Sequence, residues 1–237
     1  MSVGSTVPKW LLARERRFLY LLLFLMLLIF MGPFISEHDK GFTLYDALST
    51  GVLILGAYAE SGKKSSLVVA LAIFVPAVAL VWLDHFDQST SYALPRSILS
   101  ILFFTYIGGA ILTHVLKAER VTFDKICAAL CSYLLIGVIF AFLYSLLEFL
   151  NPGMFLAGGE VIPQGDPRAF HGAGLGQAIY FSFTTLTTLG YGDIAGATPV
   201  AKNLSVLEAL IGQIYLVVLV ARLVGMEISH SSPKDGA

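Results

Sequence analysis

The 237-residue sequence carries little charge, because only 13% of its residues are Asp, Glu, Lys or Arg, whereas a soluble domain has about 25%. Hydrophobic residues make up 57% of the chain. A soluble core could not bury that much apolar surface, so the composition predicts an integral membrane protein with one membrane domain. The net charge is −1 with no basic stripe, which removes the electrostatic basis for nucleic-acid binding.

Cysteine and histidine are also scarce. Cys127 and Cys131 lie four residues apart within an apolar run, and two cysteines do not make a disulfide framework. They are interpreted as buried thiols on one helix face. The five histidines are scattered without metal-ligand spacing. No cluster of nucleophile, base and metal ligands is visible, so we expect neither an enzyme nor a cofactor.

Long apolar runs dominate the remaining sequence, and a membrane-spanning helix needs about 20 such residues. The candidate spans are residues 18–35, 42–59, 67–83, 97–116, 126–149 and 200–224. A shorter apolar segment, residues 175–187, cannot cross. The first span follows three arginines, as a signal peptide would, but its apolar run is long and lacks a small-x-small cleavage site. We therefore expect a retained helix.

Lys and Arg predict the orientation of these spans. A cytoplasmic N-terminus places most of them inside: Lys9, Arg14, Arg16, Arg17, Lys63, Lys64, Lys117, Arg120, Lys125, Arg222 and Lys234. It leaves Lys40, Arg96, Arg168 and Lys202 outside. An even number of spans then places both termini in the cytoplasm of a multi-pass protein of the cell inner or plasma membrane.

The segment between the last two spans has an unusual composition. Asn151-Pro152-Gly153 ends the fifth helix, and the half-length segment 175–187 runs into residues 188–192, Thr-Leu-Gly-Tyr-Gly. Irregular backbone at membrane depth is tolerated only where protein shields it or where it lines a water-filled path. Glycine permits conformations that other residues avoid. A row of carbonyls with the Thr188 hydroxyl could thus replace the water around a dehydrated cation.

The run Tyr-Phe-Ser-Phe-Thr-Thr-Leu-Thr-Thr-Leu-Gly-Tyr-Gly-Asp-Ile, residues 180–194, resembles the pore helix and selectivity filter of potassium channels. The family filter reads T-V-G-Y-G, and Leu189 replaces its Val with the carbonyl retained. The stretch Leu-Glu-Ala-Leu-Ile-Gly-Gln, residues 207–213, resembles the inner helix of bacterial members. The resemblance covers residues 126–225, while the first 120 residues share only the number of helices.

This resemblance implies roles for individual residues. Thr188, Leu189, Gly190, Tyr191 and Gly192 would form the filter, with K⁺ bound at the first four of them. Asp193 would gather cations at the outer mouth, and Gly212 would be the bend point of the inner helix. Glu208 is interpreted as supporting the pore helix from behind, and Glu148 as an interfacial residue. One loop per chain implies a homotetramer.

A voltage sensor needs several basic residues along its helix, since each charge moved contributes about 2.3 kcal/mol per 100 mV. At the outer end of the fourth span Arg96 stands alone, and no Lys or Arg follows until Lys117. We therefore expect a six-helix channel without a working voltage sensor. His171, in the outer loop, is interpreted as a solvated histidine, with pH-dependent conductance as the alternative. The sequence does not indicate the gating stimulus, nor whether Arg96, Glu208 or His171 modulates it.

The expected fold is an all-α membrane protein with six transmembrane helices and a re-entrant pore helix and filter between helices five and six. Residues 1–125 would form a four-helix domain with a basic linker, residues 126–225 the pore domain, and residues 226–237 a short cytoplasmic tail. The expected function is passive potassium conduction without steep voltage gating, with copies of itself and lipid as partners and no soluble ligand domain. The alternatives are a weakly selective cation channel and a membrane sensor or scaffold. The small size and short tail are typical of a prokaryotic protein.

Overall fold

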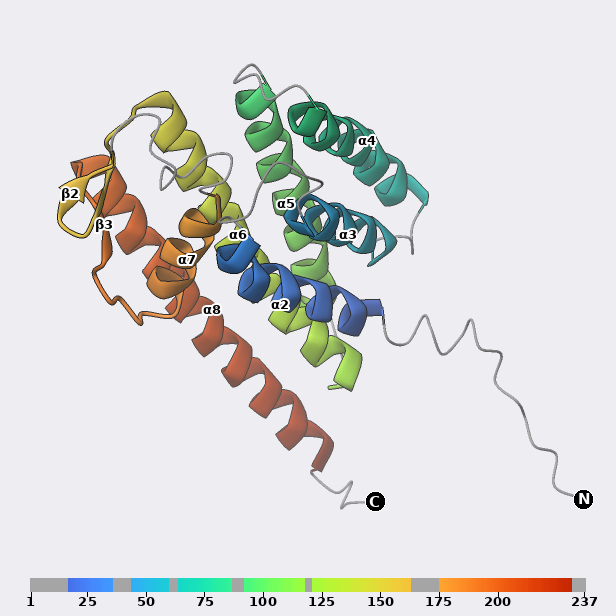
Figure 1. Ribbon diagram of the computed structural model, residues 1–237. Helices are drawn as coiled ribbons and strands as arrows, with labels where there is room; N and C mark the ends of the chain where they lie inside the picture. Colours follow the sequence, from blue (N-terminus) through green and yellow to red (C-terminus); the bar gives the residue numbers. More distant parts are fainter. Residues whose placement is uncertain are drawn as a thin grey trace, which may run out of the picture.

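The structure, a computed structural model, describes residues 17–35, 44–59, 64–86, 92–117, 121–162 and 175–231. Helices occupy most of this part of the chain (Figure 1). They are α2 (Arg17–Ile35), α3 (Leu44–Ala59), α4 (Lys64–Phe86), α5 (Ala93–Leu116), α6 (Phe123–Leu150), α7 (Leu175–Leu186) and α8 (Pro199–Ser231). Each of the seven apolar segments read from the sequence is thus helical.

Three helices among the described residues are long and apolar enough to cross a membrane: Leu94–Leu116, Phe123–Leu150 and Pro199–Met226. Three shorter apolar helices are Arg17–Phe30, Ala47–Tyr58 and Leu67–Leu83. The last three predicted spans therefore have the required length. For the first three, crossing stays a prediction.

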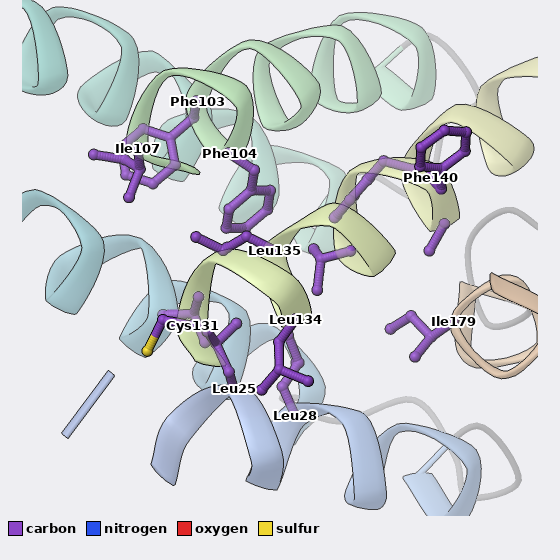
Figure 2. Close-up of a cluster of buried hydrophobic side chains, with 14 of the residues drawn as sticks. Leu25, Leu28, Phe103, Phe104, Ile107, Cys131, Leu134, Leu135, Phe140 and Ile179 are labelled. Carbon is purple, nitrogen blue, oxygen red and sulfur yellow. The ribbon is translucent and has the colours of Figure 1, made fainter. Parts of the chain in front are cut away.

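Helix α6 is the centre of the fold. It packs against α5 on one side, α2 on another and α7 on a third. Figure 2 shows this arrangement, with Leu25 of α2, Phe104 of α5 and Ile179 of α7 around Leu134 and Leu135 of α6. Helix α8 also contacts α6 and α7. The remaining helices, α3 and α4, lie farther from α7 and α8 (Figure 1).

Two helix ends do not coincide with the divisions of the expected domains, and the domains themselves stay a prediction. Helix α6 begins at Phe123, because the Thr122 hydroxyl caps it by accepting the Lys125 backbone N–H at 3.4 Å. The expected division between residues 125 and 126 therefore falls inside a helix. At the other end α8 continues to Ser231, beyond the expected end of the pore domain at residue 225.

A small antiparallel sheet follows α6, which the sequence reading did not anticipate. Strand β1 (Phe155–Ala157) pairs with β2 (Glu160–Val161) through the turn Gly158-Gly159, and with β3 (Ile194–Gly196) on its other side. Both turn glycines have positive φ, 61° and 87°, as two-residue hairpin turns require. The sheet joins the chain before α7 to the chain after it.

Helix α8 also contacts the N-terminal helices at its C-terminal end. The Arg222 guanidinium donates a hydrogen bond to the Leu116 carbonyl at the end of α5. A cation there meets the negative end of the helix dipole. The last turn of α5 is thereby linked directly to the C-terminal third of α8.

Candidate functional site

The candidate site is residues 188–192, called here the filter segment. The chain leaves the end of α7 and turns back beside it toward β3 (Figure 1). Backbone hydrogen bonds hold this turn to α7, from the Thr188 N–H to the Thr185 carbonyl at 2.9 Å and from the Gly190 N–H to the Thr184 carbonyl at 3.1 Å. The position of α7 therefore determines the position of the filter segment.

The sign of φ alternates along the filter segment. Thr188, Gly190 and Gly192 have φ of 60°, 54° and 78°, whereas Leu189 and Tyr191 do not have positive φ. A regular β-strand turns successive carbonyls to opposite sides, and this alternation lets them turn to the same side. Thr188 holds a left-handed conformation that costs a non-glycine residue about 1–2 kcal/mol. Such strain persists where the surrounding structure enforces it, often at functional sites.

The filter segment is exposed throughout in the single chain. Leu189 is 55% and Tyr191 71% exposed, so packing against the described residues covers less than half of either side chain. The Thr188 hydroxyl donates to the Thr187 carbonyl at 2.6 Å, which leaves its oxygen lone pairs available. The filter segment therefore exposes its backbone polar groups, as a binding surface must.

Asp193, directly after the filter segment, is bound from two sides. Its carboxylate accepts a hydrogen bond from the Tyr180 hydroxyl of α7 at 2.9 Å. Its carbonyl accepts the Gly158 N–H of the hairpin turn at 2.8 Å. Asp193 therefore ties α7 and the sheet to the end of the filter segment while it remains exposed.

Gly212 lies where α8 approaches the other end of the filter segment. A Cβ built there would lie 2.7 Å from both the carbonyl oxygen and the Cδ1 of Leu186, the last residue of α7. The Tyr133 hydroxyl of α6 donates to the same carbonyl at 3.3 Å. Helix α8 is continuous through Gly212. The described role of this glycine is close packing, and its bending stays a prediction.

Glu208 is fully buried behind α7. One carboxyl oxygen, Oε2, accepts a hydrogen bond from the Tyr144 hydroxyl of α6 at 2.6 Å. The other, Oε1, is hydrogen-bonded to the Ser182 hydroxyl of α7. Ser182 Oγ also lies 2.7 Å from the Gly137 carbonyl oxygen of α6. Glu208 thus joins α6, α7 and α8, and its role as a support of a pore helix stays a prediction.

Glu148 differs from its expected interfacial role, because it is buried with only 2% exposure. Its carboxylate accepts the N–H groups of Gly153 at 2.7 Å and Met154 at 2.9 Å. These are donors of the turn between α6 and β1. The acid therefore fixes the start of the sheet rather than facing the membrane surface.

Other predicted residues lie apart from the filter segment. Arg96 is in the first turn of α5, and His171 falls outside the described residues. Cys127 and Cys131 are free and buried in α6, as expected. No group of three or more His, Cys, Asp or Glu able to hold a metal ion occurs among the described side chains.

Sequence reasoning missed Tyr144, Tyr180 and Ser182 as members of this site. Each is a hydroxyl-bearing residue within an apolar helix, and such a residue needs a partner when buried. That signal identifies them as candidates, but no local pattern indicates which distant residue each would meet. The hairpin had a stronger signal, the pair Gly158-Gly159 between two short segments, Phe-Leu-Ala before it and Glu-Val after it.

Residues 128–228 match the family model described as "Ion channel". The match covers nearly all of α6, then the sheet, α7, the filter segment and most of α8. Neither a curated protein nor a solved structure matches the chain. Together with the apolar helices, the family match supports an ion channel in a membrane.

Proposed function

We propose that the chain is one subunit of a homotetrameric, potassium-selective channel that conducts passively. The observation that carries this proposal is the alternating sign of φ at Thr188–Gly192, held to the end of the short helix α7. Rings of backbone carbonyls that replace an ion's hydration shell are the basis of potassium filters. Potassium ions are bound at Thr188, Leu189, Gly190 and Tyr191, and no other cofactor takes part.

The exposed surfaces support assembly around a shared axis. Only 11% of the most apolar 18-residue stretch of α8 is buried, against 67% of the corresponding stretch of α6. Helix α8 therefore presents its apolar side chains outward. The side chains of Leu189 and Tyr191 are also more than half exposed. Copies of the chain would cover these surfaces, and lipid would cover the rest. One filter segment per chain requires several copies to form a ring.

Asp193 and Glu208 have supporting roles in this proposal. Asp193 is exposed at the outer end of the filter segment, where its negative charge concentrates cations. Glu208 holds α7 from behind. Opening involves the filter segment itself or the inner part of α8 around residues 221–225. The first four helices contribute no steep voltage sensing, since α5 carries Arg96 as its single Lys or Arg.

The test is the reversal potential of the purified full chain in a planar bilayer, with potassium on one side and sodium on the other. We expect a shift toward the potassium equilibrium potential. A clear current that reverses near zero would replace the proposal with a weakly selective cation channel. A verified tetramer that carries no current at any pH or lipid composition would contradict conduction and favour the sensor or scaffold alternative.

A variant of the filter segment tests whether the measured current passes through this protein. Gly192→Val places a β-branched side chain at φ 78°, where it is strongly disfavoured. No atom lies within 4 Å of the built Cβ, so the change acts on the backbone of the filter segment rather than on packing. We expect the purified variant to assemble and to carry no selective current.

A further inference from the structure

The Glu208 carboxyl is hydrogen-bonded only to hydroxyl groups of described residues. Tyr144 donates to Oε2, and Ser182 lies against Oε1. Ser182 Oγ lies within hydrogen-bond distance of a second acceptor, the Gly137 carbonyl, at 2.7 Å. The arrangement is therefore a chain of four polar groups from α6 through α7 and α8 back to α6.

Counting protons along this chain distinguishes the two states of the carboxyl. A serine hydroxyl has one proton, so with an ionised Glu208 it can serve either Gly137 or Glu208, and the other acceptor faces only lone pairs. With a proton on Oε1, Glu208 donates to Ser182, Ser182 donates to Gly137, and Tyr144 donates to Oε2. Every hydrogen bond is then made, and a buried unmet acceptor is costly.

The charges around Glu208 favour the same state. Helix α7 and strand β3, which pack against α8, contain no charged residue. Helix α6 carries Asp124, Lys125 and Glu148 near its two ends, and Glu148 lies one turn from Tyr144. The titratable groups that face Glu208 are the hydroxyls of Tyr144 and Tyr133. None of these supplies the positive charge that a buried carboxylate needs.

We propose that Glu208 is held as the neutral acid, and that its proton completes the link that positions α7 behind the filter segment. The inference rests on the proposed function and extends it to regulation. Ionisation removes the proton between Glu208 and Ser182, so Ser182 keeps a hydrogen bond to only one of its two acceptors, which loosens α7. The N–H groups of Thr188 and Gly190 donate hydrogen bonds to the carbonyls of Thr185 and Thr184. A shift of α7 therefore moves the filter segment. Conduction therefore falls as Glu208 loses its proton.

The variant Glu208→Gln tests this directly. A glutamine amide donates from its nitrogen to Ser182 and accepts from Tyr144 at its oxygen, which reproduces the neutral acid and cannot ionise. In proteoliposomes of the full chain, we expect wild-type potassium flux to fall from neutral to alkaline pH, by about tenfold per pH unit beyond the midpoint. The variant should conduct at neutral pH and lack this fall.

Glu148→Gln is the matched control, since it changes another buried acid of the same region. Its carboxylate accepts backbone N–H groups, so it should retain the alkaline decline of the wild type. Equal pH profiles of wild type and Glu208→Gln would overturn the proposal. So would a correctly assembled Glu208→Gln that fails to conduct at neutral pH, because that result would mean that the ionised carboxylate is needed.

A second measurement does not depend on conduction. The infrared C=O stretch of a protonated carboxylic acid differs from that of a carboxylate. In a detergent without ester groups, the wild-type minus Glu208→Gln spectrum at neutral pH should contain the protonated band, and the band should vanish at alkaline pH. Absence of the band overturns the inference whatever the flux. A band in a wild type that conducts at no pH would instead show that the proposed function has failed.

Discussion

Helices α2–α5 and helices α6–α8 are both apolar, but the described network of side-chain hydrogen bonds between helices lies in the second group. Within the first group, apolar contacts include Phe103 near the ring of Phe74 and against Gly56. The tertiary side-chain hydrogen bonds described above each involve α6, α7 or α8. In a membrane, polar contacts between helices add direction to packing that is otherwise non-directional.

This difference corresponds to what each region has to position. Apolar contacts tolerate small shifts, whereas hydrogen bonds need separations near 2.7–3.2 Å. Hydrogen bonds hold the filter segment to α7, and further hydrogen bonds of Ser182 and Tyr133 hold α7 to α6 and α8. Directional contacts therefore fix the positions of α7 and the filter segment, and substitutions at these contacts should have larger effects than the matched substitutions at exposed positions of α2 and α5.

The largest contrast should come from glycine replacement. Gly190→Val should abolish potassium flux while expression and assembly persist, because Gly190 has φ 54° and the left-handed conformation costs other residues about 1–2 kcal/mol each. Gly109→Val in α5, where no atom lies within 4 Å of the built Cβ, should leave flux intact. Flux assays on size-checked tetramers measure both, and a conducting Gly190→Val would contradict the filter assignment.

A second contrast compares two glycines of α8. Gly212→Ala places a Cβ 2.7 Å from the Leu186 carbonyl oxygen, and such overpacking costs about 1–3 kcal/mol. Gly225→Ala meets no atom within 4 Å and gains helix propensity of up to about 1 kcal/mol. Thermal unfolding in detergent should show a lower midpoint for the first variant and an equal or higher one for the second. Equal midpoints would mean that Gly212 is not a packing contact.

A third contrast compares two tyrosines. Tyr144→Phe removes the donor to Glu208 Oε2 and should cost about 1–3 kcal/mol, the penalty of a buried acceptor left unpaired. Tyr20→Phe in α2 changes a side chain that is 46% exposed, and should stay within about 0.5 kcal/mol. The same unfolding assay measures both. A stability loss as large for Tyr20→Phe would remove the distinction between the two regions.

The smallest effect concerns the first region alone. Arg96→Gln should leave the slope of the conductance–voltage relation nearly unchanged, because one charge crossing the whole field contributes about 2.3 kcal/mol per 100 mV and steep gating needs several. Voltage steps on reconstituted protein measure the slope. A strong flattening would show that the first four helices sense voltage after all.

Helix positions could be predicted well from the sequence, because apolar length and terminal residues are local properties. The expected segment 175–187 is α7 (Leu175–Leu186), and the first expected span, 18–35, is α2 (Arg17–Ile35). Where bounds differ, polar residues at the ends are the cause. Helix α4 starts at Lys64 and ends at Phe86, since a helix extends beyond the apolar residues that identify it.

The site could be predicted only in part. The filter residues form one continuous motif, so a single segment of sequence identifies them. The partners of Glu208 come from α6 and α7, and the burial of Glu148 depends on a turn that follows its helix. These contacts arise from tertiary packing, which local patterns do not encode. The sequence indicated Glu208 as a support of the pore helix but not which hydroxyls it would contact.

The three-stranded sheet has a consequence for the thermodynamics of ion binding. It fastens the chain before α7 to the chain directly after the filter segment, through the Leu156–Ala195 pair and the Gly158 N–H. The segment is thereby a loop with both ends anchored, and its conformational entropy is lost when the protein folds. A loop ordered in advance has little more to lose when an ion arrives. In the proposed channel, each ion would then be exchanged for the next without the backbone being reordered.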